Sequence, residues 1–343
     1  MRILLQIFRT RIFTIIASLA LWIFTAGPKL PPETDPIIDK VMSSEIPELI
    51  SGDTGYVTSQ GLKIWYESVL PEKTKCGTVL LITGTGGSAI YWPQNFISAL
   101  INSGYQVIRY DQRSAGLSDL VEIWDRKNPY TLADMADDAV AIIDHLDVRE
   151  AHLVGLSMGG MIAQEIAIKH LGRVKSLTLM MTSGHVGDPE LPQMSSRYFI
   201  GSILKGIPLL KYRLVGGEKN LIKERIAKTI AILGYEDLDI KKLAEMVLND
   251  LRKRRGVSIK GVFQHQAAVA VSDSRYEKLK TLDTPALIIH GTEDQIFPVE
   301  HGKKLVEVIP NAKSLWLEGT GHVFPFPNMD KVMESILLHL QSS

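Results

Sequence analysis

Cysteine is almost absent from this chain, since Cys76 is the only one among its 343 residues. A single thiol excludes an internal disulfide and any metal site built from several cysteines. It does not indicate the redox compartment in which the protein works.

An excess of charge of either sign is also missing. Lys and Arg total 38, as do Asp and Glu, so the formal net charge is zero. Domains that bind nucleic acid usually carry a basic excess, and the sequence therefore predicts no nucleic-acid partner.

Apolar residues, in contrast, are present in the amount that a folded core needs. They make up 45% of the chain and charged residues 22%, which is ordinary for a globular protein. The length suits one large α/β domain or one domain with an insertion.

Strand-like and helix-like segments alternate along most of the chain. Because the strands are apolar throughout, the pattern predicts a mostly parallel sheet covered by helices on both faces. A helical block interrupts the alternation and is expected to form a cap. The predicted strands are 56–67 (two strands around a Gln60–Gly61 turn), 78–84, 105–111, 151–157, 174–183, 285–291 and 312–319. The predicted organisation is a transmembrane segment at 1–27, a linker at 28–50, an α/β core at 51–184 and 281–343, and a cap at 185–280.

The N-terminus departs from the globular pattern. Arg2, Arg9 and Arg11 precede or border an apolar stretch that ends at Gly27, which predicts an uncleaved membrane anchor with the N-terminus inside. The rest of the chain would then be periplasmic or extracellular. One alternative is secretion after cleavage of a signal peptide, which Phe24 and Pro28 disfavour at the available cut sites. The other is a helix of a soluble domain.

A Gly-x-Ser-x-Gly pattern stands where a predicted strand meets a predicted helix, in "LVGLSMGGM". A sharp strand-to-helix turn leaves little room for flanking side chains, so Gly155 and Gly159 favour a strained turn that presents Ser157 as a nucleophile. The alternative is a simple tight turn.

A serine nucleophile needs a base, and the base needs a carboxylate. His322 lies in a glycine-rich loop directly after the last predicted strand, and Asp294 follows the end of the strand before it. We predict His322 as the base and Asp294 as its partner. The alternatives are Glu293 as the partner and a surface-loop role for His322.

An oxyanion needs preorganised N–H donors. We predict the backbone N–H groups of Met158, first in its helix, and of Thr85, in the loop after the first parallel strand. A phosphate-binding loop is the alternative for "GTGGS", and the lack of a following Lys-Ser or Lys-Thr disfavours it.

Two charged motifs favour structural roles. The sequence Asp111-Gln112-Arg113 is expected to form ion pairs and turns that fix the neighbouring loops. The run 252–255, "RKRR", is expected to be a solvated helix end in the cap, with contact to anionic lipid as the alternative.

The chain resembles the α/β-hydrolase superfamily from about Gly55 to its C-terminus, and within it the bacterial aclacinomycin methylesterase-like esterases. The resemblance is carried by "YWPQNF", "VIRYDQRSAGLSD", "PYTLADMADDAVAIIDHLDV", "AHLVGLSMGGMIAQEIA", "FQHQAAVAVSD" and "PALIIHGTEDQIFPVEHGKKL". It implies the α/β-hydrolase fold, ester hydrolysis through an acyl-enzyme, no cofactor or metal, and a helical cap. The order Ser157, Asp294, His322 matches that of the family. Many relatives have His-Gly where this chain has Thr83-Gly84.

These observations together predict a membrane-anchored serine esterase or lipase acting on a small hydrophobic ester. The predicted bilayer and a cap rich in Ile and Leu favour a lipid-like ester such as a monoacylglycerol. Hydrolysis of a carbon–carbon bond or a lactone with the same triad is the alternative, and a non-catalytic ligand-binding protein is a second one. Epoxide hydrolases and haloalkane dehalogenases are excluded because they need a carboxylate where Ser157 stands.

Overall fold

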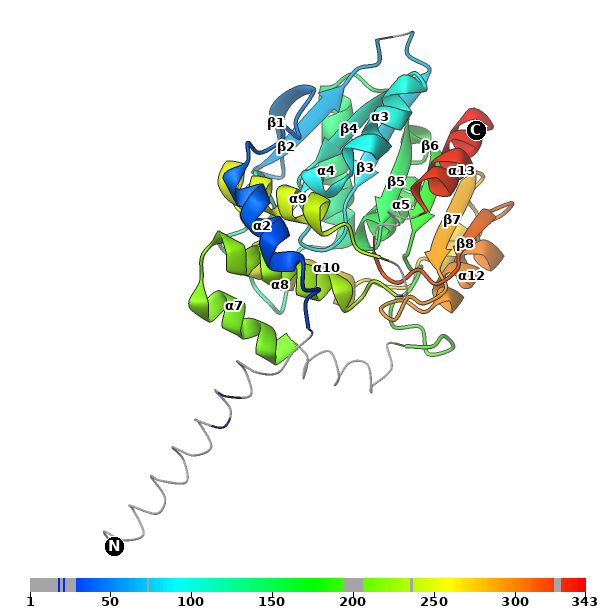
Figure 1. The fold of residues 1–343 in the computed structure, drawn as a ribbon. Helices are drawn as coiled ribbons and strands as arrows, with labels where there is room; N and C mark the ends of the chain where they lie inside the picture. The colour runs from blue at the N-terminus through cyan, green and yellow to red at the C-terminus, as the bar shows by residue number, and fades with distance from the viewer. Residues whose placement is uncertain are drawn as a thin grey trace, which may run out of the picture. The chain divides into compact units, whose positions relative to one another are not determined.

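The structure is a computed structural model that describes residues 18, 21, 29–72, 74–193, 206–234, 237–323 and 328–343. Its centre is an eight-stranded sheet with the strand order β1-β2-β4-β3-β5-β6-β7-β8 (Figure 1). The strands are β1 (Asp53–Ser59), β2 (Leu62–Val69), β3 (Gly77–Ile82), β4 (Tyr105–Tyr110), β5 (Ala151–Leu156), β6 (Val174–Met180), β7 (Ala286–Gly291) and β8 (Lys313–Leu317).

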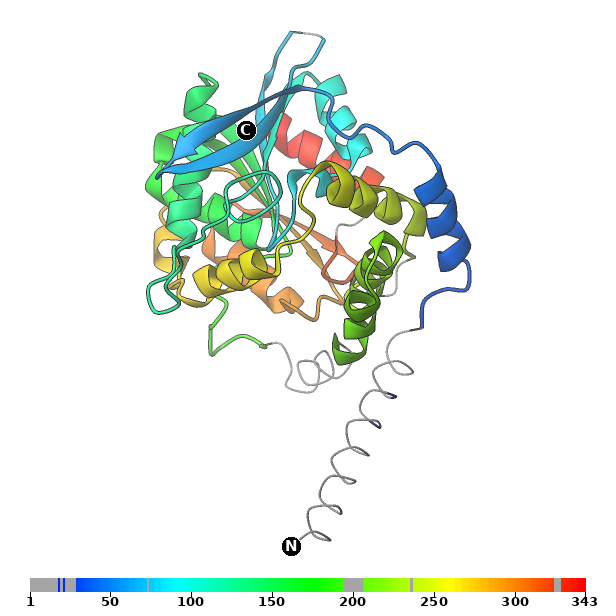
Figure 2. The same cartoon turned by 90° about the vertical axis from the view of Figure 1, so that its left-hand side faces the viewer.

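The sheet is mostly parallel. The strand β2 pairs antiparallel with both β1 and β4, and every other pair is parallel. The β1–β2 hairpin forms one edge, which faces the viewer in Figure 2. Its turn residues Gln60 and Gly61 have φ of 47° and 80°, values that favour Gly or Asn and suit a two-residue hairpin turn.

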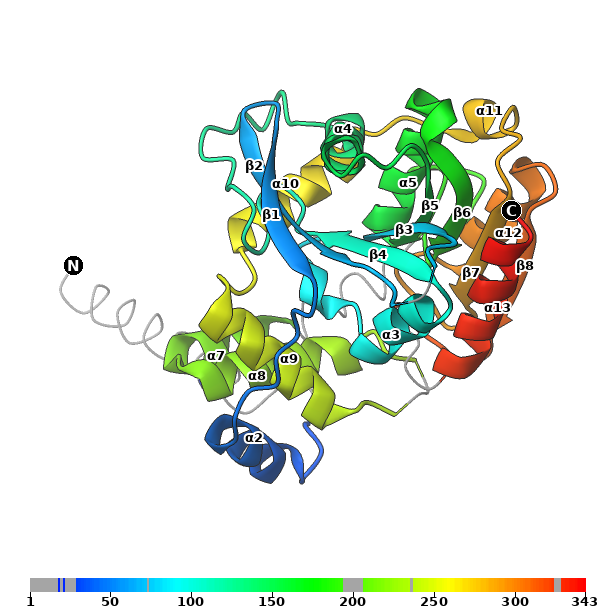
Figure 3. The same ribbon diagram turned by 90° about the horizontal axis from the view of Figure 1, so that it is seen from above.

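Helices cover both faces of the sheet, as Figure 3 shows from above. The buried apolar residues form two clusters, one on each face, because parallel strands are apolar on both sides. One face carries α3 (Gln94–Asn102) and α13 (Met329–Gln341), and the other carries α4 (Leu132–His145), α5 (Met158–Lys169) and α12 (Val299–Val308).

The start of α4 is encoded locally. Thr131 is its N-cap, and its hydroxyl accepts a hydrogen bond from the N–H of Asp134 while the Asp134 carboxylate accepts from the N–H of Thr131. This reciprocal capping box satisfies two backbone donors that the helix itself cannot pair.

The described helices and 3-10 turns outside these layers have the following bounds: α2 (Thr34–Ser43), η1 (Ala89–Tyr91), η2 (Leu171–Arg173), η3 (Ile207–Leu209), α7 (Leu210–Val215), α8 (Glu218–Ile230), α9 (Ile240–Lys253), α10 (Ile259–Ala270) and α11 (Tyr276–Leu279).

The chain divides into two compact units. The larger one, residues 47–194, 233–237 and 249–343, contains the sheet, its flanking helices and α10. The smaller one, residues 1–46, 195–232 and 238–248, contains α2, α7 and α8, and in it Lys219 and Lys223 form ion pairs with Asp35. The sequence-based boundaries of core and cap stay predictions.

The helix α2 lies in the segment 28–50 that the sequence analysis expects to be a linker. The prolines of this segment do not prevent the helix, because Pro36 falls in its first turn, where a missing N–H breaks no helical hydrogen bond. Between 185 and 280 the described residues form helices and no named strand, as expected, with one bridge pairing Gly234 and Thr320.

The prediction of a membrane-anchored, extracytoplasmic enzyme is corrected by the structure. Within the described ranges no helix is long and apolar enough to cross a bilayer. The longest described helices, α4 and α9, have 14 residues each, whereas a spanning helix needs about 20. The predicted anchor at 1–27 lies outside the described residues except for Ser18 and Leu21.

Candidate active site

Ser157 occupies a strained turn between β5 and α5. Its φ of 55° and ψ of −121° are rare for a residue with a side chain. The Ser157 N–H donates to the carbonyl of Met180 at 2.8 Å, and the Ser157 carbonyl accepts from the N–H of Gly160 at 2.9 Å. The turn therefore has the strand–turn–helix geometry of a nucleophile elbow, with the hydroxyl beside the positive end of α5.

The two glycines that flank Ser157 are required by space. A Cβ on Gly155 would lie 2.4 Å from the carbonyl oxygen of Gly159, and one on Gly159 would lie 2.1 Å from that of Ile82. Backbone atoms cannot yield at such distances. This confirms the prediction that the flanking positions tolerate no side chain.

The loops after β7 and β8 bring Asp294 and His322 to this serine. His322 Nε2 lies 2.9 Å from Ser157 Oγ, and His322 Nδ1 lies 2.7 Å from Asp294 Oδ2. With the ring proton on Nδ1, His322 donates to the carboxylate and Nε2 accepts the serine proton. The adjacent residue Glu293, which the sequence left as an alternative, is not the one that contacts His322.

Asp294 is buried and kept ionised by its neighbours. Its Oδ1 accepts hydrogen bonds from the N–H groups of Ile296 and Phe297 at 2.8 and 2.9 Å, and His290 Nε2 lies 3.4 Å from its Oδ2. Burial works to raise the pKa of Asp294, but His322 and His290 outweigh it and hold that pKa below its usual value of 3.8. The group is thus a permanent anion beside the imidazole.

Two other serine–histidine pairs exist among the described residues, and neither has this arrangement. Ser176 Oγ lies 2.7 Å from His152 Nδ1, and Ser183 Oγ lies 2.8 Å from His301 Nδ1. All four side chains are buried, and burial lowers the pKa of His152 to about 4. Neither imidazole carries a carboxylate on its other nitrogen. Of these three serines, only Ser157 combines partial exposure with a histidine that a carboxylate supports.

The loop after β3 runs directly against the elbow. A Cβ on Gly84 would lie 3.2 Å from the Cβ of Ser157, and the Thr85 hydroxyl lies 3.7 Å from Met158 Sδ. The two predicted donors, the backbone N–H groups of Thr85 and Met158, therefore lie on adjoining segments, and no described residue accepts a hydrogen bond from either of them.

The residues Asp111, Gln112 and Arg113 hold the loop after β3 and its neighbours in place through hydrogen bonds and an ion pair, as the sequence predicts. Asp111 is completely buried and accepts from the N–H groups of Ala89 at 2.8 Å and Leu117 at 2.7 Å. Gln112 donates to the carbonyl of Thr83 at 2.7 Å, and Arg113 forms a buried ion pair with Asp138.

Arg254 is an exception to the expected solvated helix end, since Arg252, Lys253 and Arg255 are exposed as expected. The Arg254 side chain is only 3% exposed, its guanidinium forms an ion pair with Asp111, and the same group lies 4.2 Å from the centre of the Trp65 ring. A buried carboxylate such as Asp111 needs a cation, and a run of basic residues in a sequence does not indicate which of them will supply it.

His265 on α10 was missed by the sequence analysis. It is fully buried and contacts both the Gly86 N–H and the Arg113 carbonyl. His265 shares the buried face of α10 with Gly261 and Ala268, which stand four residues before and three residues after it. This helical spacing of small residues around a histidine is the sequence signal that could have indicated its burial.

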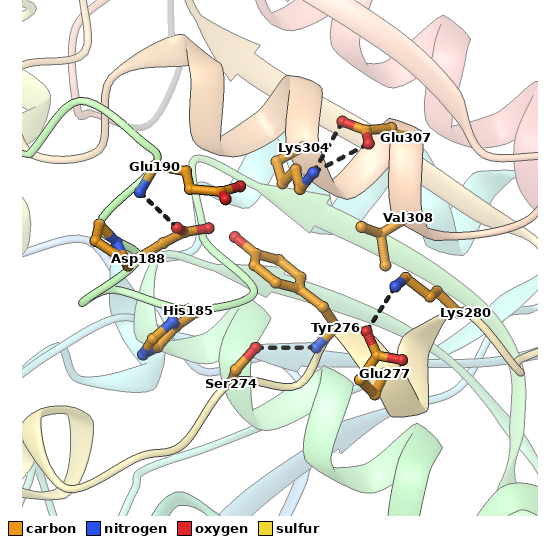
Figure 4. A pocket seen from close by; sticks show the side chains of 11 residues that line it. His185, Asp188, Glu190, Ser274, Tyr276, Glu277, Lys280, Lys304, Glu307 and Val308 are labelled. Carbon is orange, nitrogen blue, oxygen red and sulfur yellow. Dashed lines mark hydrogen bonds and ion pairs between the residues drawn. The ribbon is translucent and has the colours of Figure 1, made fainter.

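A cavity of about 390 Å³ lies at the loop 185–190, α11 and α12 (Figure 4). The ring of Tyr276 points toward Asp188 and Glu190 there, and burial raises the pKa of its hydroxyl. None of Ser157, Asp294 and His322 lines this cavity. In the described part of the chain no group of three or more His, Cys, Asp or Glu side chains is placed to hold a metal ion.

Known proteins resemble this chain in sequence and fold. Rhodomycin D methylesterase DauP of Streptomyces sp. strain C5 is 27% identical over 311 residues, covering 84% of this chain and 99% of that protein. The 2-hydroxy-6-oxononadienedioate/2-hydroxy-6-oxononatrienedioate hydrolase of Paraburkholderia phymatum is 26% identical over 263 residues, covering 76% and 85%. The crystal structure of an enol-lactonase from Burkholderia xenovorans is similar with a TM-score of 0.63 at 20% identity, covering 84% and 100%, and this likeness shows the fold alone.

The sequence profile of the alpha/beta hydrolase fold matches residues 77–328, most of the chain. The resemblance stated from the motifs is therefore confirmed, including its likeness to bacterial methylesterases. The chain belongs to the alpha/beta hydrolase fold family.

Proposed function

We propose that this protein is a serine carboxylic ester hydrolase that works through an acyl-enzyme. One observation carries the proposal: Ser157 Oγ, the His322 ring and the Asp294 carboxylate form a continuous chain of hydrogen bonds of 2.9 and 2.7 Å. The methylesterase likeness supports an ester as the substrate class.

In the proposed reaction, Ser157 Oγ attacks the ester carbonyl while His322 Nε2 takes its proton. Asp294 holds the ring and stabilises its positive charge. The N–H groups of Thr85 and Met158 stabilise the oxyanion. The tetrahedral intermediate collapses, the alcohol leaves with the proton from His322, and water hydrolyses the acyl-enzyme by the same route.

Apolar side chains beside Gly86 and His322 support a hydrophobic ester. Val262 and Val257 lie against the backbone of Gly86, the residue after Thr85. The ring of Phe297 meets that of His322 edge-on, with centroids 5.4 Å apart. Apolar side chains at these two positions favour apolar acyl or alcohol groups, because burying such groups is favourable.

The test is hydrolysis of p-nitrophenyl esters by the wild type and by Ser157→Ala. The Ser157→Ala variant should lose on the order of 10⁴-fold or more in kcat, because triad residues act as a unit. Ser176→Ala is the matched control, since it removes a serine hydroxyl that also contacts a histidine. It should leave kcat within about twofold, because this side chain is buried and cannot reach substrate. Activity that persists in Ser157→Ala would overturn the proposal.

A second set of measurements distinguishes ester hydrolysis from lactone hydrolysis, carbon–carbon bond hydrolysis and non-catalytic binding. The wild type should hydrolyse esters with higher kcat/KM than lactones or carbon–carbon substrates of the 2-hydroxy-6-oxo-dienoate type, and p-nitrophenyl esters of increasing chain length should report the acyl preference. A fluorophosphonate probe should label the wild type and not Ser157→Ala. An unlabelled wild type would point to a binding protein.

A further inference from the structure

His265 connects α10 to the loop that carries Thr85. Its Nδ1 lies 3.0 Å from the backbone nitrogen of Gly86, and its Nε2 lies 2.7 Å from the carbonyl oxygen of Arg113. The side chain is completely buried. These partners lie far away in the sequence, since 179 residues separate Gly86 from His265.

The two partners determine the tautomer. A backbone N–H only donates, so Nδ1 must present its lone pair to Gly86. A carbonyl oxygen only accepts, so Nε2 must carry the proton that it donates to Arg113. One neutral form of the imidazole satisfies both partners, and the protonated form would place an N–H against the N–H of Gly86.

Gly86 stands at the apex of the turn that follows β3. The turn is closed by the N–H of Gly87, which donates to the carbonyl of Gly84 at 3.2 Å. Gly86 has φ of +65°, and a Cβ on it would lie 2.4 Å from Val262 Cγ2 on α10. Fixing the Gly86 N–H fixes the peptide plane that joins it to Thr85, and the hydrogen bond from Gly87 to Gly84 closes the same turn. Only the two backbone dihedrals of Thr85 lie between that plane and the Thr85 N–H, so the two contacts together restrict the direction of that N–H.

The helix α10 is itself held tightly where it supports this apex. A Cβ on Gly261 would lie 2.0 Å from the carbonyl oxygen of Ser114, so the helix backbone packs directly on the segment that follows β4. His265 stands one helical turn further along the same face. The helix that carries His265 is therefore in close backbone contact with the segment that contains Arg113.

We propose that His265 is a positioning residue for ester hydrolysis, which as a neutral imidazole holds Gly86 and thereby aims the Thr85 N–H at the oxyanion. The inference rests on the proposed function, and no contact of His265 with substrate is implied. In this proposal His265, a residue outside the triad, fixes the position of the Thr85 N–H, one of the two proposed oxyanion donors.

The surroundings keep this imidazole neutral. Burial lowers the pKa of His265 to about 4, and the positive charge of Arg113 acts in the same direction, although the hydrogen bond to the Arg113 carbonyl opposes it. The charged groups nearby are Arg113 and its ion-pair partner Asp138, and the Tyr130 ring lies edge-on at 6.4 Å between centroids.

Two amide substitutions, each of which replaces the polar atom of one ring nitrogen, test the two nitrogens separately. In His265→Asn the amide oxygen can take the place of Nδ1 and accept from Gly86, whereas in His265→Gln the amide nitrogen can take the place of Nε2 and leaves the Gly86 N–H unpaired. We expect His265→Gln to lower kcat by roughly 10- to 100-fold, the effect of misplacing a transition-state contact. Its KM should change less than about threefold, because an oxyanion donor acts on the transition state. His265→Asn should retain kcat within about fivefold.

His339 supplies a matched control. It is a buried histidine on α13 whose Nε2 contacts the carbonyl of Leu177 at 3.0 Å, with no contact to the oxyanion loop. His339→Gln should lower the melting temperature without changing kcat more than about twofold, since it affects packing only.

Equal losses of kcat in His265→Gln and His265→Asn, or a loss confined to KM, would show a merely structural role and overturn the proposal. If neither variant folds, ¹⁵N NMR of the wild type decides, because the proposal requires a protonated Nε2 and an unprotonated Nδ1 at pH 7. A proton on Nδ1 would refute it. Failure of the proposed function would be seen differently, as a wild type that hydrolyses no ester and binds no fluorophosphonate.

Discussion

Two histidines serve the same serine in the proposed reaction, in contrasting surroundings. The His322 side chain is 13% exposed and holds a carboxylate, Asp294, on its Nδ1. His265 is fully buried and holds a backbone N–H on the same ring nitrogen. The partner of Nδ1 decides the role. A carboxylate stabilises the imidazolium that proton transfer creates, whereas an N–H donor permits only the neutral ring.

The two histidines also differ in whether their charge changes during the proposed reaction. His322 is placed to exchange a proton with Ser157, so its chemistry depends on a change of charge. His265 is placed to keep a backbone turn still, so its value depends on the absence of any change of charge. The atom that contacts Nδ1 thus decides whether a histidine exchanges a proton, as proposed for His322, or holds a backbone turn in place, as proposed for His265.

Removing the charge from the His322 region should have the largest effect. In Asp294→Asn the amide NH₂ would donate to Nδ1, which moves the ring proton to Nε2 and prevents His322 from accepting the serine proton. We expect kcat to fall on the order of 10⁴-fold, measured with a p-nitrophenyl ester. Glu293→Gln is the control and should stay within about threefold. Equal losses in the two variants would show that the neighbouring carboxylate shares the role.

Removing the cation behind the oxyanion loop should come next. Arg254→Met leaves the fully buried Asp111 without its ion-pair partner. We expect the free energy of unfolding to fall by about 3–5 kcal/mol in urea denaturation. Adding Asp111→Asn to this variant should restore little of that loss, because both carboxylate oxygens accept backbone N–H bonds and one of them would be replaced by an NH₂ donor. Unchanged stability of Arg254→Met would contradict the buried pair.

The neutrality of His265 should be visible in the dependence of stability on pH. Its pKa is about 4 in the folded chain, whereas the ordinary value for a histidine in an unfolded chain is 6.5. Between these values the unfolded chain binds a proton that the folded chain does not, so stability falls as the pH drops from 6.5 to 4. The contribution is roughly 3 kcal/mol over this range.

The measurement is the free energy of unfolding of His265→Asn and wild type between pH 4 and 7. The variant should show a flatter curve. His152→Asn should flatten it as well, because burial also lowers the pKa of His152 to about 4, yet it should leave kcat unchanged. A curve of unaltered slope in His265→Asn would show that this histidine is not kept neutral by folding.

The smallest effect should come from the side chain of Thr85. If Thr85 acts through its backbone N–H, Thr85→Ala should keep kcat within about threefold, since only a weak hydroxyl contact to Met158 Sδ is lost. The measurement is kcat with the same ester. A loss comparable to that of His265→Gln would assign the oxyanion contact to the hydroxyl instead.

Much of the architecture was predictable from local patterns. The strands predicted at 105–111 and 285–291 are β4 (Tyr105–Tyr110) and β7 (Ala286–Gly291) in the structure. Apolar strands and capping residues act over a few positions, so their signals survive in the sequence alone. Asp294 and His322 were predictable as candidates because each directly follows a strand of one parallel sheet.

Two expectations failed, and one of them failed because of a distant contact. Arg254 lies in a run of basic residues that resembles a solvated helix end, and its burial against Asp111 arises from a partner 143 residues away. The apolar stretch near the N-terminus suggested a membrane anchor, and no helix in the described ranges meets that requirement.

The sequence by itself determined the sheet, the elbow around Ser157 and the class of residue that could assist it, since periodicity and glycine spacing are local properties. Only the tertiary structure decided which carboxylate contacts His322, which arginine neutralises Asp111, and that His265 holds the turn beside Thr85. Each of those choices joins atoms more than 20 residues apart, and a hydrogen bond depends on distances that no local pattern encodes.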